Sequence, residues 1–180
     1  MSRKLFVSVH LYLAAFFSPI VIIMAVSGGL YLLDYKGETS STMVGQITGA
    51  RLDADSETLK ADVAALLASL NIIDARIEEV RARGDSFNTR PSSRVNYTLR
   101  QTDTGVEVEE LNPNLQAIVM ELHKGHGPAI YVVMQKIFAL GLVLIMLSGL
   151  YLGWMSPMYR GKTLLLSGLG VLVFFSLVLI

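Results

Sequence analysis

LYLAAFFSPIVIIMAVSGGLYLL, residues 11–33, contains no charged residue. An α-helix rises about 1.5 Å per residue, so roughly 20 apolar residues cross a hydrocarbon core about 30 Å thick. Two further runs are similar, because residues 129–154 contain a single charge, Lys136, and residues 164–180 contain none. Lipid offers no hydrogen-bond partner to a peptide backbone. The sequence therefore predicts three transmembrane helices.

Charged residues are distributed unevenly along the chain. Residues 34–127 hold all 15 acidic residues, whereas basic residues also flank the apolar runs at Arg3, Lys4, Arg160 and Lys162. Short cytoplasmic segments are enriched in lysine and arginine. We therefore expect a bacterial inner-membrane protein with its N-terminus and its second loop in the cytoplasm. The segment between the first two helices, and the C-terminus, would then be periplasmic.

The first apolar run has an alternative interpretation as a cleaved secretory signal. Arg3 and Lys4 precede it, and AVS at residues 25–27 resembles a cleavage site. The apolar core of a signal usually has about 7–15 residues. This run extends from about Leu5 to Leu33, so an uncleaved anchor is the favoured interpretation.

The charged segment after the first run has the periodicity of a small folded domain. Apolar residues recur at helical spacing between residues 59 and 70, and partial alternation predicts a strand over residues 77–83. Alternation over residues 95–99 and again from residue 106, around a turn at residues 101–105, predicts a hairpin. Residues 37–42 are expected to be a polar exit from the membrane, and residues 84–92 a polar loop.

The predicted fold is therefore an α-helical membrane protein with three transmembrane helices and a small α+β domain between the first two. We expect the N-terminus and first helix in residues 1–36, the periplasmic domain in 37–122, the second helix in 123–155, and a short loop with the third helix in 156–180.

The composition excludes several kinds of site. The chain has no cysteine, which excludes disulfides, iron–sulfur clusters, thiolate metal sites and covalently attached haem. The middle segment has no histidine before His123, and its carboxylates are spread along the chain. We find no complete catalytic constellation and no nicotinamide, flavin or quinone motif, so the chain alone is not expected to be an enzyme. The expected environment is a lipid bilayer, and no nucleic-acid partner is expected.

Short motifs give the chain a family resemblance. VNYTL at residues 95–99, GVEV at 105–108 and LNP at 111–113 resemble the small PepSY domain. The flanking helices resemble the PepSY-associated transmembrane family of bacterial inner-membrane proteins. In that family a histidine opens the first span and a Leu-His-x-Gly-like segment precedes the second; here His10 and LHKG at residues 122–125 occupy these positions.

The resemblance implies two alternative functions. Some larger relatives resemble ferric-siderophore reductases that hold b-type haem, which implies non-covalent haem b and an accessory electron-transfer role here. The implied haem-iron ligands are His10 and His123, with His126 in reserve. These relatives have four or more spans and further histidines, whereas this chain has three predicted spans and three histidines. PepSY domains are also associated with protease inhibition, which implies a membrane-anchored interaction module that binds a protein partner.

A weak internal repeat bears on the histidines. MAVSGGLYL at residues 24–32 is echoed by MLSGLYL at residues 146–152. Because the first two spans run in opposite directions, we expect His10 to face the small residues Ser148 and Gly149, and His123 to face the small-residue stretch from Ser27 to Gly29, which includes Gly28. Glycine permits close approach of a flat ligand or of another backbone. Ordinary packing through small residues is the alternative interpretation, and Gly149 with Gly153 fits it.

The candidate cofactor-binding set is therefore His10, His123, His126, Lys136, Gly28 and Gly149. Lys136 is the only charge inside a span, where it could pair with a haem propionate or extend to the headgroups. His10 and His123 are expected a membrane thickness apart, so they cannot share one iron. A bis-histidine site would need a second chain, in a homodimer or a larger membrane complex; otherwise the iron would stay five-coordinate.

Overall fold

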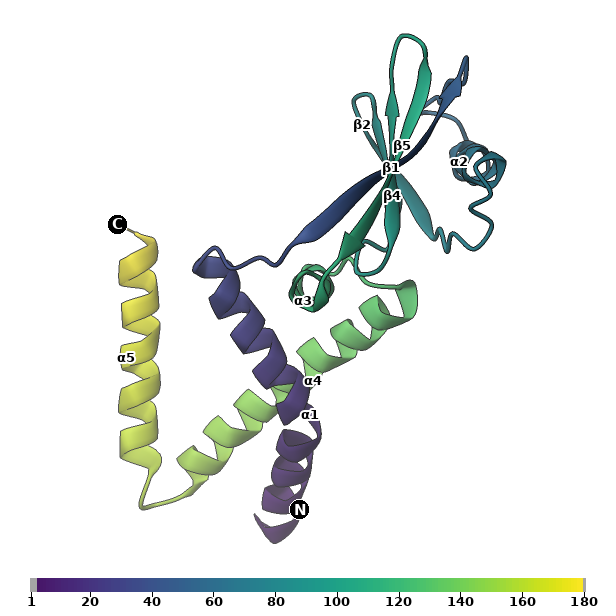
Figure 1. Cartoon of the computed structure of the whole chain (residues 1–180). Coiled ribbons are helices and arrows are strands. Elements are labelled where there is room, and N and C mark those ends of the chain that lie inside the picture. The colour runs from purple at the N-terminus through teal and green to yellow at the C-terminus, as the bar shows by residue number, and fades with distance from the viewer. Residues whose placement is uncertain (1–2, 180) are drawn as a thin grey trace. The chain divides into compact units, whose positions relative to one another are not determined.

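The computed structural model of the chain describes residues 3–179, so Ile180, the last residue of the third predicted span, lies outside the described part. The chain forms two compact units (Figure 1). One unit joins the residues up to Ile22 with those from Lys136 onward, and the other comprises Ile23–Gln135. Helices α1 and α4 each contribute residues to both units.

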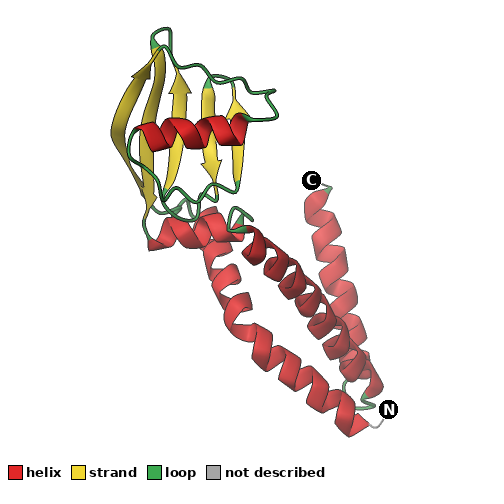
Figure 2. Ribbon diagram, turned by 90° about the vertical axis from the view of Figure 1, so that its right-hand side faces the viewer, coloured by secondary structure: helices red, strands yellow, loops and turns green. Residues whose placement is uncertain are grey.

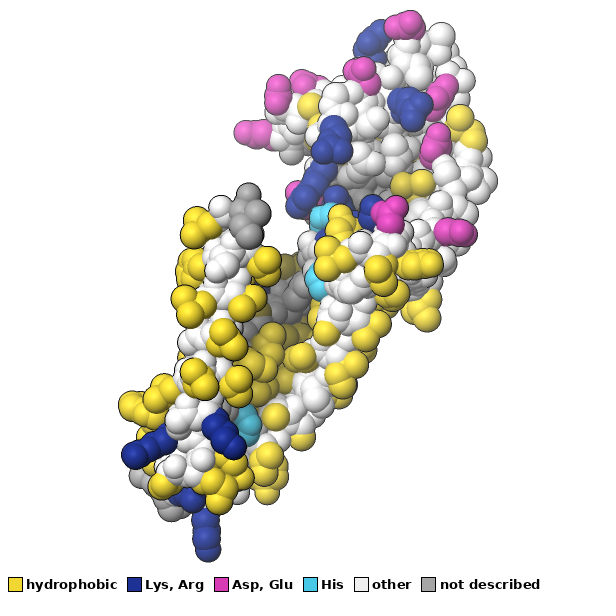
Figure 3. Space-filling model, turned by 90° about the vertical axis from the view of Figure 1, so that its left-hand side faces the viewer, with side chains coloured by type: hydrophobic (Ala, Val, Ile, Leu, Met, Phe, Trp, Pro, Cys, Tyr) yellow, Lys and Arg dark blue, Asp and Glu magenta, His cyan; other side chains and the backbone are white. Residues whose placement is uncertain are grey.

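Three helices are long and apolar enough to cross a membrane: α1 (Arg3–Leu32), α4 (Ala129–Met155) and α5 (Arg160–Val178). The prediction of three candidate spans is thus confirmed. Most of their large hydrophobic side chains are exposed, as suits contact with lipid chains. Figure 3 shows hydrophobic side chains over the helical segments, and acidic and basic side chains over the sheet-containing unit.

Helices α1 and α4 pack closely at one glycine. Gly141 of α4 is buried against Phe17 of α1, which is itself buried. A Cβ atom at Gly141 would lie only 2.5 Å from two ring carbons of Phe17. The same phenylalanine packs edge-on against Phe138, with ring centroids 5.8 Å apart. Only glycine therefore fits at this contact.

The second unit contains a five-stranded antiparallel sheet in the order β1-β5-β4-β3-β2. Helix α2 (Leu59–Ser69) covers one face of the sheet (Figure 2). Val63 and Leu67 of this helix pack with Leu99, Val106 and Val108 to form a fully buried core. The strands are β1 (Thr39–Thr48), β2 (Glu79–Arg83), β3 (Ser86–Arg90), β4 (Asn96–Gln101) and β5 (Gly105–Pro113).

Two strands occupy segments for which the sequence predicted no strand. Residues 37–42 were expected to be a polar exit, but β1 begins at Thr39 and pairs with β5 along its length. Residues 84–92 were expected to be a loop, but they contain β3, in which Phe87 and Thr89 are buried. Both expectations were wrong because these strands carry few apolar residues.

The second transmembrane helix also begins later than expected. The boundary was expected at residue 123, but His123 is the last residue of α3 (Leu115–His123), and α4 begins at Ala129. Asn114 caps α3, because its side chain accepts a hydrogen bond of 2.9 Å from the backbone N–H of Ala117. Gly125, with φ of +78°, then adopts a left-handed conformation that breaks the helix. His123 is therefore positioned by a short separate helix.

Candidate functional site

His123 lies against the end of α1 in the second unit. Its Nδ1 is 2.8 Å from the hydroxyl of Ser27, a buried side chain. A Cβ atom built on Gly28 would lie 3.3 Å from the imidazole Cε1 and 3.9 Å from Nε2. The absence of a side chain at Gly28 therefore leaves room for this edge of the ring.

His10 makes the corresponding serine and glycine contacts in the first unit. Its Nδ1 is 2.8 Å from the hydroxyl of Ser148. A Cβ atom on Gly149 would lie 3.4 Å from Cε1 and 4.0 Å from Nε2. The structure thus brings each histidine against the serine–glycine pair that the internal repeat placed opposite it. Within residues 3–179, neither Nε2 atom has a hydrogen-bond partner.

A cavity of about 430 Å³ opens beside His123. Gly28, Tyr31 and Leu32 line it from α1, and Met120 and His123 line it from α3, with Lys124 beside them. The cavity is largely apolar and has one imidazole and one ammonium group in its lining. An apolar ligand with a negatively charged edge would fit these residues.

The backbone of His123 is held from α4. The side-chain amide of Gln135 donates a hydrogen bond of 3.0 Å to the carbonyl oxygen of His123. Sequence reasoning missed this contact and did not identify Ser27 and Ser148 as hydrogen-bond partners. The serines could have been found, because each precedes the glycine of the repeated motif. Nothing in the sequence pairs Gln135 with His123.

His126 belongs to a different cluster. Its Nδ1 lies 2.8 Å from a carboxylate oxygen of Glu121, and it does not line the cavity beside His123. Glu121 also accepts hydrogen bonds from Ser92 and Lys124, and Arg90 lies 3.6 Å away. Burial raises the pKa of Glu121, but the donors from Lys124, Ser92 and His126 outweigh it, so the pKa lies below its usual value. This cluster fastens the β3–β4 loop to α3.

Replacing Glu121 with glutamine is expected to loosen this attachment in a pH-dependent way. A carboxylate whose pKa is lowered by folding stabilises the folded state above its unfolded pKa, and this contribution is lost as the pH falls through the folded pKa. At neutral pH the variant should lose on the order of 1–3 kcal/mol. The deficit should shrink as the pH falls through the folded pKa of Glu121, which lies below the ordinary value, and should disappear where the wild-type carboxyl is also protonated.

The measurement is thermal unfolding of the full chain in mild detergent at neutral and acidic pH. Glu57→Gln is the matched control, because Glu57 is an exposed carboxylate on the same unit. An equal deficit at both pH values would show that the charge of Glu121 does not fasten the loop.

Lys136 and the Gly149–Gly153 pair are the remaining features that the sequence singled out. Lys136 is exposed on α4, and within the described residues it has no ion pair. Gly153 contacts Thr163 of α5, since a Cβ atom there would lie 2.6 Å from the threonine hydroxyl oxygen. Gly149 lies against His10 of α1, whereas Gly153 lies against Thr163 of α5. The two glycines therefore do not form one packing surface for a single neighbouring helix. Between residues 3 and 179, no group of three or more histidine, cysteine or acidic side chains could hold a metal ion.

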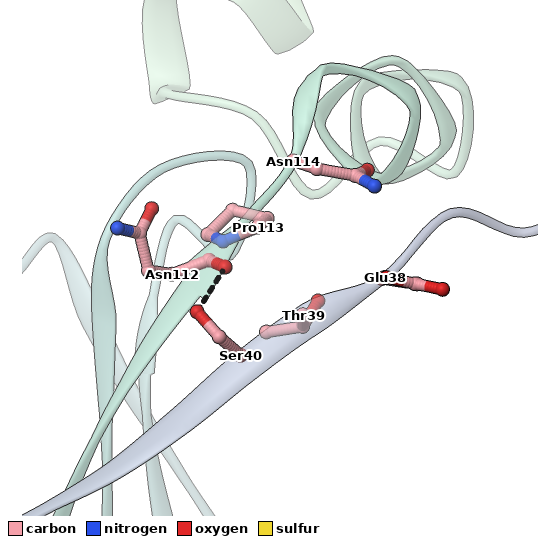
Figure 4. Close-up of a pocket in the computed structure, with 6 residues that line it drawn as sticks. All are labelled: Glu38, Thr39, Ser40, Asn112, Pro113 and Asn114. Carbon is pink, nitrogen blue, oxygen red and sulfur yellow. Dashed lines mark hydrogen bonds between the residues drawn. The ribbon is translucent and has the colours of Figure 1, made fainter.

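A second, open cavity of about 570 Å³ lies where β1 begins and β5 ends (Figure 4). Six polar or small residues line it, and the hydroxyl of Ser40 donates a hydrogen bond of 3.2 Å to the carbonyl oxygen of Asn112 across the two strands. The lining residues are Glu38, Thr39, Ser40, Asn112, Pro113 and Asn114. This cavity contains no imidazole or thiol, so it offers no haem ligand.

Comparison with known proteins matches the chain to a protein family. The family described as the PepSY-associated TM region matches residues 7–169, which include His10, His123, His126 and both serine–glycine pairs. No curated protein and no solved structure matches the chain.

Proposed function

Since the chain belongs to the family of PepSY-associated transmembrane regions, we propose that it binds b-type haem and serves as an accessory electron-transfer subunit. One observation carries this proposal. The same arrangement occurs twice, with a histidine Nδ1 2.8 Å from a serine hydroxyl and a glycine against the ring. In both copies Nε2 has no hydrogen-bond partner among the described residues.

The residues around His123 fit a haem group. A neutral imidazole is a common axial ligand of haem iron, and His123 would supply it. Gly28, Leu32 and Met120 would contact the apolar part of the macrocycle, and the ammonium group of Lys124, which also binds Glu121, would donate a hydrogen bond to a propionate. Haem, when bound, supplies one-electron redox chemistry. His10 would supply the ligand of the other site, where Gly149 leaves space beside the ring.

The competing explanation is that both histidines only join helices. Hydrogen bonds between transmembrane helices contribute about 0.6 kcal/mol on average, so such contacts occur without any ligand. The two explanations differ in what they expect of Nε2. A joining role uses only Nδ1, whereas haem binding requires Nε2 to be unprotonated and accessible.

The absorption spectrum of the purified full chain tests the proposal. After expression with sufficient haem, the protein in mild detergent should show a Soret band, and a sharp α band on reduction. Added haem should bind to saturation with one haem at each of the two histidines. A folded protein that stays colourless and does not take up added haem would refute the proposal.

The proposed location is the bacterial inner membrane, with the N-terminus cytoplasmic and the sheet-containing unit periplasmic. The basic residues Arg3, Lys4, Arg160 and Lys162 support this orientation. Reporter fusions after Gly45 and Arg90 should be active only in a periplasmic format, and a fusion at Gly161 only in a cytoplasmic format. Periplasmic activity at Gly161 would contradict the orientation.

A second candidate function, a protein-interaction module, is favoured by the open edge of β1. The backbone N–H of Asn114 donates to the carbonyl of Glu38 at 2.9 Å, so residue 38 faces β5. Antiparallel pairing alternates along a strand, which leaves the backbone of Thr39, Ser41 and Met43 facing away from β5. Such an edge is a template for pairing with another chain.

The two edges of the sheet differ in chemistry. Strand β1 contains no charge and no proline, whereas β2, the other edge, reads EVRAR. Charged edges resist pairing, so β1 is the edge open to a partner. Glu38, Glu109 and Glu110 lie at or beside β1 in the sheet register, which favours an extended segment of a basic partner protein.

The edge is tested with an alternating threonine–valine peptide that has lysine at both ends. The peptide should slow hydrogen exchange at Ser41 and Met43 in the full chain in nanodiscs, and a peptide with glutamate ends should not. Ser41→Pro removes one outward N–H and should abolish protection. Ser41→Ala loses the same side-chain hydrogen bond to Glu109 but keeps the outward N–H, so the peptide should still protect this variant from hydrogen exchange. Equal protection by both peptides, or concentration-dependent protection without peptide, would refute a basic partner.

A further inference from the structure

The hydrogen bonds around Ser27 determine where the imidazole proton of His123 lies. The Ser27 hydroxyl is 3.0 Å from the carbonyl oxygen of Met24 and 2.8 Å from Nδ1 of His123. A carbonyl oxygen can only accept, and a hydroxyl has one proton to donate. Both contacts are hydrogen bonds only if Ser27 donates to Met24 and accepts from an N–H at Nδ1. Otherwise two acceptor oxygens would lie 3.0 Å apart without a proton between them.

The same reasoning applies to His10. The Ser148 hydroxyl is 3.0 Å from the carbonyl oxygen of Ile145 and 2.8 Å from Nδ1 of His10. In both places the serine therefore accepts from the histidine. A neutral imidazole with its proton at Nδ1 has a lone pair at Nε2.

We propose that Ser27 and Ser148 are positioning residues that fix His123 and His10 as the Nδ1–H tautomer, with Nε2 held ready to bind iron. Each serine acts through its histidine and does not itself touch the ligand. The purpose assigned to the tautomer rests on the proposed haem function, whereas the proton at Nδ1 follows from the hydrogen bonds alone.

The group that orients the histidine here, a serine hydroxyl, differs from that of soluble metal sites, where a carboxylate or a backbone carbonyl commonly orients the ligating histidine. A carboxylate in a membrane span would cost several kcal/mol. A serine whose hydroxyl donates to a backbone carbonyl of its own helix still has an oxygen that can accept a hydrogen bond, and it carries no charge. This makes serine suitable for orienting a histidine within a membrane.

The tautomer can be measured in the haem-free protein. Nitrogen-15 NMR of histidine-labelled full chain in nanodiscs distinguishes a protonated from an unprotonated ring nitrogen. We expect His123 and His10 in the wild type to show protonated Nδ1 and unprotonated Nε2. In Ser27→Ala, His123 should become a mixture of tautomers, while His10 should be unchanged.

Ser18→Ala is the matched control. Ser18 also lies on α1 and donates to the carbonyl three residues before it, at 3.1 Å, but it contacts no histidine. This variant should leave both tautomers unchanged. Ser27→Thr keeps the hydroxyl and should restore the wild-type tautomer of His123. Comparing Ser27→Thr with Ser27→Ala therefore separates the effect of the hydroxyl from the effect of altering residue 27.

Haem titration separates this inference from the proposed function. Loss of an outer partner of a ligating histidine typically lowers affinity about 10–100-fold, so Ser27→Ala should weaken haem binding at His123 by that factor. A wild type with fixed tautomers that binds no haem would refute the function and leave the tautomer assignment intact. Unchanged His123 tautomer in Ser27→Ala, or a protonated Nε2 in the wild type, would overturn the inference.

Discussion

Haem binding is expected to be lost when His10 and His123 are both replaced with alanine. In the proposal each imidazole would supply the nitrogen ligand of one site, and the cavity beside His123 is lined by no other histidine, cysteine or acidic side chain among the described residues. Each single variant should retain half of the haem of the wild type, because its other site is intact. The absorption spectrum of the reduced protein and the haem-to-protein ratio measure both effects.

His126→Ala is the control for this pair of substitutions. His126 lies at the same end of α3 but contacts Glu121 and does not line the cavity. The variant should keep full haem content. Wild-type haem content in the double variant would show that other residues ligate the haem, and the assignment of His10 and His123 as ligands would be wrong.

The largest effect on stability is expected from Gly141→Leu. The first side-chain carbon alone would lie 2.5 Å from the buried ring of Phe17, and the rest of leucine has no room. Overpacking of this kind costs about 1–3 kcal/mol and occasionally more. We expect a clear fall in the thermal unfolding temperature in detergent, together with weaker association of α1 and α4.

Two further variants make this result specific. Gly168→Leu on α5 is the matched control, because a Cβ atom there meets nothing within 4 Å. Adding Phe17→Ala to Gly141→Leu exchanges a large and a small residue across the contact and should recover part of the stability. If Gly141→Leu unfolded at the wild-type temperature, the two helices would not be held together at this glycine.

The membrane part of the fold was readable from the sequence because lipid imposes a simple requirement. A run of about 20 apolar residues is needed, and α1, α4 and α5 each meet it. The soluble part was only partly readable. Strands β4 and β5 were predicted because apolar and polar residues alternate, as they do where one face is buried.

Strand β1 could not be predicted from its pattern, because it is an edge strand. Its side chains are mostly exposed, so they carry no alternation, and its place in the sheet follows from pairing with β5. Only Gly45 and Ile47, near its end, approach the hydrophobic residues under α2. Edge strands of this kind are defined by backbone hydrogen bonds, which a side-chain pattern does not record.

The candidate site was partly predictable for a related reason. The repeat of serine and glycine indicated which residues each histidine would face, and the structure has those contacts. It could not indicate that Gly141, outside the repeat, packs against Phe17 of α1 so tightly that a Cβ atom would lie 2.5 Å from the ring. It also could not indicate that Gln135 holds His123 through a backbone carbonyl, since any residue offers one.

The pairing of β1 with β5 has a mechanical consequence. Strand β1 follows α1 and β5 leads through α3 into α4, and the two strands meet at their α1- and α3-proximal ends, where Thr39 pairs with Pro113. A lateral force that pulled α1 and α4 apart would load this ladder from that end. The force would break the hydrogen bonds between β1 and β5 one pair at a time from that end. It would not load all of these bonds together in shear. The β1–β5 pairing would therefore resist such a force only weakly, because the force acts on one pair of hydrogen bonds at a time.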